Sequence, residues 1–401
     1  MGYFDDISRA PPDPILGLTA AFNSDPRPHK VNLSVGLYKT EALLTPIMSP
    51  VKKAEKNILD RETTKEYLPI DGDVEFLQRV GPLVFGEDFW MSNKQRCFAA
   101  QTVGGTGALR IGGDFLKHYV EGHLFVSDPT WPNHKGVFTR CGMTVESYPY
   151  YDAKEHKLDF TRWCHFLEKL PPRRVVVLHA CCHNPTGADP TMQEWEILCD
   201  LMKKRQLIPF FDSAYQGLGN GLDEDAQVLR LFAKKISEMV VACSFSKNFG
   251  LYAERVGALF ILAQSNEAAL AIGSKIKEII RTSYSNPPLH GARIIAEILS
   301  TKSLRQDWQK ELHEMRMRIV EMRKALTFAL IKGGSSIDFR YLEKRSGMFC
   351  FTGLSKHQVD HLIADFGIYL TPDGRINVLG INRDNLSHVV NAILNVIKRT
   401  S

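Results

Sequence analysis

Val240-Val241-Ala242-Cys243-Ser244-Phe245-Ser246-Lys247 is the stretch that decides the fold class. Its first four residues are apolar, and a short run of this kind is typical of a strand buried on both faces of a sheet. Amphipathic stretches separate such runs, and residues 191–205 are rich in good helix formers. This alternation predicts an α/β fold, with a mostly parallel central sheet and helices on both faces. The runs predicted as strands are residues 123–126, 175–179, 208–211, 240–243 and 258–262.

The pattern changes after about residue 304. Residues 304–332 are highly charged and contain few helix breakers, so they predict one long helix that leaves the sheet. Residues 348–351 predict a short strand, and residues 385–399 predict a final helix. These elements indicate a second, smaller α+β domain.

The N-terminal segment contains Pro11, Pro12 and Pro14, which favour an extended arm over a core element. The chain has 401 residues, a length that suits two domains packed together. The expected division is an arm of residues 1–12, a small domain of residues 13–45 and 315–401, and a large domain of residues 46–314.

Composition excludes several classes of protein. A formal net charge of +5 over this length, without a dense Lys/Arg block, argues against a nucleic-acid partner. No apolar run approaches the roughly 20 residues that span a bilayer, so we expect no membrane partner. The N-terminus resembles neither a signal peptide nor a transit peptide, and we expect a cytoplasmic protein. The eight cysteines form no CxxC pair, which disfavours a zinc ribbon.

A glycine-rich segment, Gly104-Gly105-Thr106-Gly107, precedes a plausible helix start. Glycines let a ligand approach the backbone, and free N–H groups at the start of a helix attract phosphate. The segment is not a GxxxxGK[ST] loop, and Arg110 occupies the third glycine position of a GxGxxG motif. Taken alone, a tight turn into a helix remains the commoner interpretation.

Two charged residues follow predicted strands. Asp212 ends the run 208–211, with Tyr215 three residues later, and Lys247 follows the run 240–243. The carboxyl ends of parallel strands face the crevice where α/β folds bind ligands. A partly desolvated lysine there is a nucleophile toward carbonyl groups. A solvated or capping aspartate and a surface lysine in a turn remain the alternatives.

Other strand ends carry polar and aromatic groups. After residues 175–179 comes Ala180-Cys181-Cys182-His183-Asn184-Pro185-Thr186-Gly187, which reads better as a turn presenting Asn184 than as a zinc site. Trp131, between two prolines, is either a core residue or a stacking surface for a flat ligand. His134 is equally open between a structural and a catalytic role. Three arginines suit carboxylate or phosphate, namely Arg255, Arg281 and Arg375.

Together these motifs resemble the class I pyridoxal-phosphate aminotransferases, in their aspartate and aromatic aminotransferase branch, with the strongest likeness to the bacterial aspartate enzymes. The resemblance runs from about residue 13 to residue 378. The strings that carry it are Asn184-Pro185-Thr186-Gly187, Asp212-Ser213-Ala214-Tyr215-Gln216-Gly217, Ser246-Lys247-Asn248-Phe249-Gly250-Leu251-Tyr252 and Tyr284-Ser285-Asn286-Pro287-Pro288. It implies the fold of the type I pyridoxal-phosphate-dependent transferases.

The resemblance implies a cofactor, pyridoxal 5′-phosphate, held as a Schiff base on Lys247. Lys247 would also move a proton between the substrate and the cofactor. Asp212 would keep the ring nitrogen protonated, so that the ring withdraws electrons. The remaining groups would be Tyr215 and Asn184 at the ring oxygen, Trp131 on the ring face, Gly105, Thr106, Ser244, Ser246 and Arg255 at the phosphate, and Tyr67 at the phosphate of a partner subunit.

The resemblance also implies the substrates, which are amino acids and 2-oxo acids. Arg375, with Gly36, Trp131 and Asn184 nearby, would bind the α-carboxylate. Arg281 of a second copy would bind the distal carboxylate of aspartate or glutamate, which makes the expected enzyme a homodimer with shared active sites. The N-terminal arm would cross to that partner. The expected reaction transfers the amino group of L-aspartate to 2-oxoglutarate and gives oxaloacetate and L-glutamate.

A few positions depart from the family pattern. Phe245 replaces a common tyrosine, Ala253 replaces a frequent asparagine, and Leu37 stands where aspartate-preferring members usually carry valine. Thr106 and Asn286 keep the aspartate-type residues. An aromatic aminotransferase with a dual substrate range therefore remains an alternative. A lyase or decarboxylase on the same scaffold, a binding protein without catalysis, and a zinc protein using His179, Cys181, Cys182 and His183 are more remote.

Overall fold

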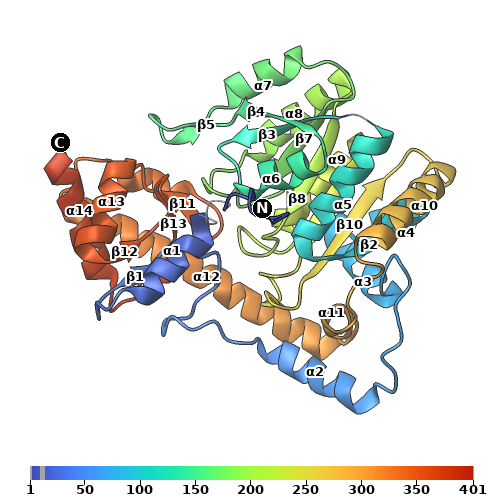
Figure 1. Cartoon of the computed structure of the whole chain (residues 1–401), viewed down its shortest axis with the longest axis horizontal. Coiled ribbons are helices and arrows are strands. Elements are labelled where there is room, and N and C mark those ends of the chain that lie inside the picture. Colours follow the sequence, from blue (N-terminus) through green and yellow to red (C-terminus); the bar gives the residue numbers. More distant parts are fainter. Residues whose placement is uncertain (1, 10–13, 121, 401) are drawn as a thin grey trace.

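The computed structural model describes residues 2–9, 14–120 and 122–400, and its central feature is a seven-stranded sheet (Figure 1). The strand order is β2-β10-β9-β8-β7-β3-β4. Within the described residues, β10 is the one strand of this sheet that runs in the direction opposite to the other six. The strands are β2 (Cys97–Val103), β3 (His123–Asp128), β4 (Thr144–Pro149), β7 (Val175–His179), β8 (Ile208–Ser213), β9 (Met239–Ser244) and β10 (Val256–Leu262).

The five predicted strands are confirmed, because each coincides with a strand of this sheet. Successive residues of a strand point to opposite faces of the sheet and pack into two separate hydrophobic clusters. In β8, Phe210 packs against α5 (Gly104–Tyr119), and Phe211 packs into the cluster on the other face of the sheet. Both are fully buried. Helices therefore cover both faces, as the continuous apolar runs predicted.

Crossover helices connect the parallel strands, as in other α/β folds. Between β7 and β8 lies α8 (Met192–Arg205), which begins with a capping box of Thr191 and Glu194 and confirms the helix predicted for residues 191–205. The others around the sheet are α3 (Val74–Phe85), α4 (Glu87–Asn93), α6 (Asn133–Arg140), α7 (Phe160–Lys169), α9 (Gln227–Lys235), α10 (Asn266–Ser283) and α11 (His290–Ser300). A small hairpin, β5 (Tyr151–Asp152) with β6 (Lys157–Leu158), follows β4.

A second group of elements lies beside the sheet, and the long helix α12 (Lys302–Lys332) runs between the two groups and contacts both (Figure 1). We call it the C-terminal region and the rest the sheet region. Its strand pairs are β11 (Phe349–Phe351) with β13 (Arg375–Asn377), and β1 (Val31–Asn32) with β12 (Ile368–Tyr369). Its helices are α1 (Pro14–Ser24), α13 (Lys356–Phe366), α14 (Leu386–Thr400) and the 3-10 helix η3 (Phe339–Lys344), while α2 (Ser49–Arg61) packs on α11 and α12.

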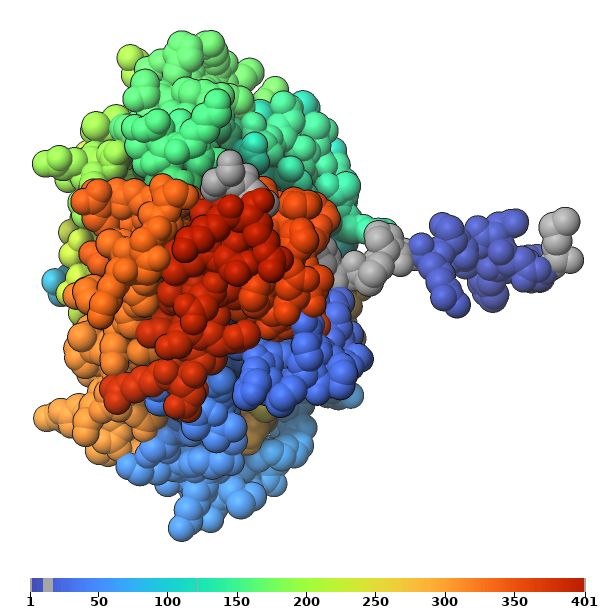
Figure 2. All heavy atoms as spheres, turned by 90° about the vertical axis from the view of Figure 1, so that its left-hand side faces the viewer, coloured from blue at the N-terminus to red at the C-terminus, as the bar shows by residue number. Residues whose placement is uncertain are grey.

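The N-terminal segment only partly follows its prediction. Pro11 and Pro12 lie outside the described residues, and Pro14 was wrongly placed in an extended arm, because it begins α1. A proline is tolerated in the first turn of a helix, where its missing N–H has no helical partner. Residues 2–9 expose Tyr3, Phe4 and Ile7 and stand away from the body of the chain (Figure 2). No described helix is long and apolar enough to cross a membrane.

Candidate active site

A cavity of about 460 Å³ opens where the carboxyl ends of the parallel strands meet the C-terminal region. Twelve of the residues proposed from the sequence line it, although they come from segments far apart in the chain. They are Gly36, Gly105, Thr106, Trp131, Asn184, Asp212, Tyr215, Ser244, Ser246, Lys247, Arg255 and Arg375.

Lys247 follows the end of β9 and lies partly buried in the cavity wall. Its Nζ is 5.0 Å from the centre of the Tyr215 ring. Burial lowers the pKa of Lys247, and the nearby charge of Arg255 lowers it further, while Asp212 acts in the opposite direction. A lowered pKa raises the fraction of neutral amine, which is the form that attacks a carbonyl group.

A buried chain of hydrogen bonds runs from Thr130 through His134 to Asp212. The Nε2 of His134 lies 2.9 Å from its Oδ2, and the Oγ1 of Thr130 lies 2.8 Å from the Nδ1 of the same ring. Burial alone would raise the pKa of Asp212, but the hydrogen bond and the charge of His134 outweigh burial and lower it, with a smaller contribution from the charge of Lys247. Asp212 is therefore held as a carboxylate, suited to face a cationic ring nitrogen.

The histidines and cysteines fall into separate groups. The potential ligand atoms of His134, His179 and Asp212 lie within 4.8 Å of one another, as do those of Cys181, Cys182 and Asp225. The imagined zinc set of His179, Cys181, Cys182 and His183 is thus divided between different surroundings. Both ring nitrogens of His183 have other partners, Ser127 and Thr186. Burial lowers the pKa of His179 to about 3, so this ring is neutral.

A cradle of hydrogen-bond donors that suits an anion lines the same cavity as Lys247, at the start of α5. Gly104 has φ 68°, and its N–H donates to the Arg255 carbonyl at 2.9 Å. A Cβ on Gly105 would lie 2.8 Å from the Cβ of Ser244, so only glycine allows this approach. Arg255 donates to the Ser246 hydroxyl at 3.1 Å. Helix N–H groups, hydroxyls and a guanidinium are the donors that a phosphate requires.

A buried guanidinium lies on the other side of the cavity. Arg375 donates to the Asn184 side chain at 3.2 Å and to the Ser34 carbonyl at 2.6 Å. Its buried Nε has no hydrogen-bond partner among the described residues, which leaves donor capacity for a carboxylate. The guanidinium carbon lies 4.4 Å from the centre of the Phe349 ring. A Cβ on Gly36 would come within 3.0 Å of that ring, so Gly36 leaves room for it.

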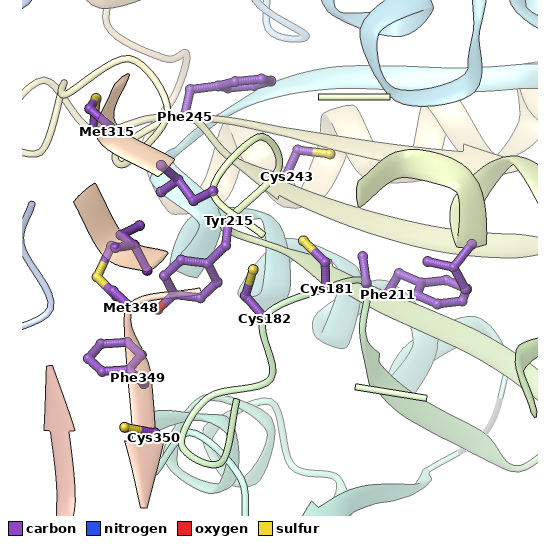
Figure 3. Close-up of a cluster of buried hydrophobic side chains, with 14 of the residues drawn as sticks. Cys181, Cys182, Phe211, Tyr215, Cys243, Phe245, Met315, Met348, Phe349 and Cys350 are labelled. Carbon is purple, nitrogen blue, oxygen red and sulfur yellow. The ribbon is translucent and has the colours of Figure 1, made fainter. Parts of the chain in front are cut away.

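Asn184 and Tyr215, the two residues expected at the ring oxygen of the cofactor, lie in contact with each other. The Asn184 amide donates to the Tyr215 hydroxyl at 3.5 Å. Burial raises the pKa of Tyr215, so its hydroxyl stays protonated and can donate. Figure 3 shows Tyr215 beside Phe349, with Cys182 close by, and the Tyr215 and Phe349 rings meet edge to face at 6.0 Å.

Two proposed residues do not line this cavity. Tyr67 is 92% exposed, and Arg281 lies exposed at the end of α10, where it donates to Ser285. The segments that carry them are joined, because the Asn286 amide donates to the Leu68 carbonyl at 2.9 Å. Both residues were expected to act on the site of a second copy, and both are exposed on these joined segments.

Sequence reasoning left His134 undecided and missed Phe349. His134 lies three residues after Trp131 in the same turn, so its proximity to a strand end was a usable signal. Phe349 belongs to a three-residue strand in a distant part of the chain and carries no motif. Its position under Arg375 becomes evident only when β11 and β13 are paired.

The chain matches the family model "Aminotransferase class I and II" over residues 28–393. It is 48% identical to the aspartate aminotransferase of Salmonella typhi, with 98% of this chain and 100% of that protein aligned. The aromatic-amino-acid aminotransferase of Pseudomonas aeruginosa is 43% identical, with 99% of each chain aligned.

A solved structure has a closely similar fold. The aromatic-amino-acid aminotransferase of Burkholderia pseudomallei, covalently bound to pyridoxal phosphate, superposes with a TM-score of 0.96 at 44% identity. The match covers 99% of this chain and 100% of that one. This chain therefore belongs to the class I and II aminotransferases, in their aspartate and aromatic branch.

Proposed function

We propose that the protein is an aspartate aminotransferase that uses pyridoxal 5′-phosphate bound to Lys247. It would transfer the amino group of L-aspartate to 2-oxoglutarate and give oxaloacetate and L-glutamate. One observation carries the proposal: a single cavity brings together an amine of lowered pKa, a buried carboxylate, an anion cradle and a buried guanidinium. Several aspartate aminotransferases among its relatives support the choice of substrate.

The residues fit the cofactor group by group. The cradle of Gly105, Thr106, Ser244, Ser246 and Arg255 suits its phosphate, and Asp212 suits its ring nitrogen. When bound, the cofactor supplies an aldehyde for Lys247 and a ring that accepts electrons from the substrate. Trp131 would cover the ring face, and Asn184 and Tyr215 would donate hydrogen bonds to the ring oxygen.

The chain's own groups would then handle the substrate. Arg375 would bind the α-carboxylate beside Gly36, which orients the α-carbon toward Lys247. The Nζ of Lys247 would take the α-proton and return it on the cofactor side. His134 would act through Asp212 by keeping that carboxylate ionised and fixed. The exchange is expected to follow ping-pong kinetics, because the amino group rests on the enzyme between the half-reactions.

A complete site would need two chains. Arg281 of a partner subunit would bind the distal carboxylate, and Tyr67 of that subunit would reach the phosphate, in a homodimer with shared sites. The exposure of both residues on joined segments supports this arrangement. The exposed apolar side chains Tyr3, Phe4 and Ile7 would suit an arm that crosses to the partner.

We also propose the domain division and location expected from the sequence. Residues 46–314 would form the large domain, residues 13–45 and 315–401 the small domain, and residues 1–12 the arm. The gathering of the short strand pairs beyond α12 supports the division. All eight cysteines are unpaired, which suits the reducing cytoplasm.

A second candidate is an aromatic aminotransferase with a dual range. Leu37 lines the cavity and adds an apolar surface beside Arg375 and Phe349. An aromatic enzyme of Burkholderia pseudomallei shares 44% of its sequence with this chain.

A panel of half-reactions distinguishes these functions. The cofactor-loaded protein is mixed separately with aspartate, glutamate, tyrosine and alanine, and the cofactor spectrum is followed. Fast conversion with aspartate and glutamate supports the main proposal, and equally fast conversion with tyrosine supports the dual range.

Arg281→Ala should slow the half-reaction with aspartate by roughly 10- to 100-fold more than the half-reaction with phenylalanine, because a charge-assisted hydrogen bond is lost only for the dicarboxylate. Equal losses would contradict the Arg281 assignment, and steady turnover by Lys247→Ala would contradict the function.

A further inference from the structure

The hairpin of β5 and β6 lies outside the main sheet and points toward the C-terminal region (Figure 1). Its turn contains His156, which has a left-handed backbone with φ 49°. The turn meets η3 and the residues that flank β11, so it joins two parts of the chain that are far apart in sequence.

The ring of His156 fills a narrow slot in the C-terminal region. One face stacks on Tyr341, with ring centres 4.2 Å apart and planes inclined by 6°. Beside the ring lies Gly353, where a Cβ would come within 2.5 Å of the His156 Cε1. Burial lowers the pKa of His156, and the charge of Arg345 lowers it further, so the ring is neutral at neutral pH and can stack closely.

Arg345 ties the hairpin to the same slot. Its guanidinium donates to the backbone carbonyl of His156. It also lies 5.5 Å from the centre of the Tyr341 ring and 5.6 Å from that of Tyr151, on the hairpin. These distances are within the range of cation–π attraction. We refer to His156, Tyr341 and Arg345 as the latch.

The latch is connected to the strand pair that carries Arg375. The Tyr341 hydroxyl donates to the Phe351 carbonyl at 3.0 Å, and the Tyr151 ring meets the Phe351 ring at 5.8 Å. Phe351 is paired with Arg375 between β11 and β13. Phe349, two residues earlier on the same strand, lies under the Arg375 guanidinium. A shift of β11 would therefore move Phe351, which is paired with Arg375, and Phe349, which lies under its guanidinium.

We propose that the latch holds the β11–β13 pair against the sheet region and so fixes the distance between Arg375 and Lys247. None of its three residues lines the cavity, so they are positioning residues that act through Arg375. The inference rests on the proposed role of Arg375 at the α-carboxylate. Every amino acid carries that carboxylate, so loss of the latch contacts should weaken the binding of all amino-acid substrates to the same extent.

His156→Gly tests this directly. Glycine adopts a positive φ freely and keeps the carbonyl that accepts from Arg345, so only the stacked ring is lost. In the half-reaction, the amino-acid concentration giving half-maximal rate should rise roughly three- to tenfold, equally for aspartate and phenylalanine. The maximal rate and the absorbance of the bound cofactor should stay as in the unaltered enzyme. His165→Ala removes an exposed ring from α7 and serves as the control.

Arg345→Met is the second variant, because it keeps an apolar stem and removes the hydrogen bond to His156. Melting temperatures are recorded for both variants, and Arg345→Met decides if His156→Gly does not fold. Unchanged half-maximal concentrations in the folded variants would overturn the proposed role of the latch, and the proposed function would not be affected. A fall in maximal rate or cofactor absorbance alone would also overturn it, because that pattern indicates a general structural loss. If the unaltered enzyme converts no amino acid, the proposed function itself fails.

Discussion

Replacing His134 with alanine should weaken cofactor binding, because His134 holds Asp212 in its ionised form. The variant loses one hydrogen bond to a buried carboxylate that is 6% exposed. Hydrogen bonds to charged groups contribute about 1.5–3 kcal/mol, which corresponds to roughly a 10- to 150-fold rise in the dissociation constant of the cofactor. The same energy would raise the pKa of Asp212 by about one to two units.

The pH dependence gives a second measure of the same loss. The pKa of Asp212 lies below the usual pKa of an aspartate. The contribution of its carboxylate to cofactor binding is therefore complete at a pH above that usual pKa, and it is lost as the pH falls through the lowered pKa. In His134→Ala, that loss should begin at higher pH. Spectroscopic titration of the apoprotein with pyridoxal phosphate, from about pH 5 to about pH 8, measures both effects.

Two controls make the result interpretable. Thr130→Val removes only the hydroxyl that faces the Nδ1 of His134, so its effect should be smaller, near 1 kcal/mol. His165→Ala removes an exposed ring and should bind the cofactor as the unaltered protein does. Unchanged affinity and unchanged pH dependence in a folded His134→Ala protein would refute the reasoning.

Two further predictions concern the cradle and a buried acid. Gly105→Ala should reduce cofactor affinity by roughly tenfold or more, because its Cβ would lie 2.8 Å from the Cβ of Ser244. In the matched control Gly107→Ala, the nearest atom to the new Cβ lies at 3.4 Å, so this variant should bind the cofactor normally. Equal affinities of the two variants in the same titration would contradict the proposed cradle. Burial raises the pKa of Asp189 from 3.8 to about 6, so the folded state holds this proton more tightly than the unfolded state. The free energy of unfolding should therefore fall, by up to about 3 kcal/mol, as the pH rises from about 4 to about 6. Asp189→Asn should remove that slope in urea titrations, and an unaltered slope would assign it to other groups.

The predicted strands were those that are buried on both faces along most of their length. Residues 240–243 and 208–211 carry no polar side chain within the sheet, so their pattern needs no tertiary information. β2 was missed because it contains Gln101 and Thr102, which look like surface residues. Both are fully buried, and the Gln101 side chain accepts from Asp73 N–H and donates to the Pro288 carbonyl. Such partners come from distant segments, so the sequence pattern does not reveal them.

The same limit applies to the site. Asp212 and Lys247 were accessible to reasoning because each follows a strongly apolar strand, and their neighbourhood follows from parallel pairing. The strands that hold Arg375 and Phe349 have three residues each, too few for any periodicity. The position of Arg375 opposite Lys247 therefore depends on packing between the two regions, and family resemblance supplied it where spacing did not.

The direction of one strand explains why Arg255 reaches the phosphate cradle. The carboxyl ends of parallel strands share an edge, so a residue that precedes a strand normally lies at the opposite edge. Arg255 directly precedes β10, which runs antiparallel to β2 and β9, and Val256 is paired with Val103. The reversal brings Arg255 to the edge where β2 ends at Val103, directly before Gly104, and where β9 ends at Ser244. A β10 parallel to its neighbours would place this guanidinium a strand's length from Lys247, so the cradle requires the reversed strand as much as it requires the glycines.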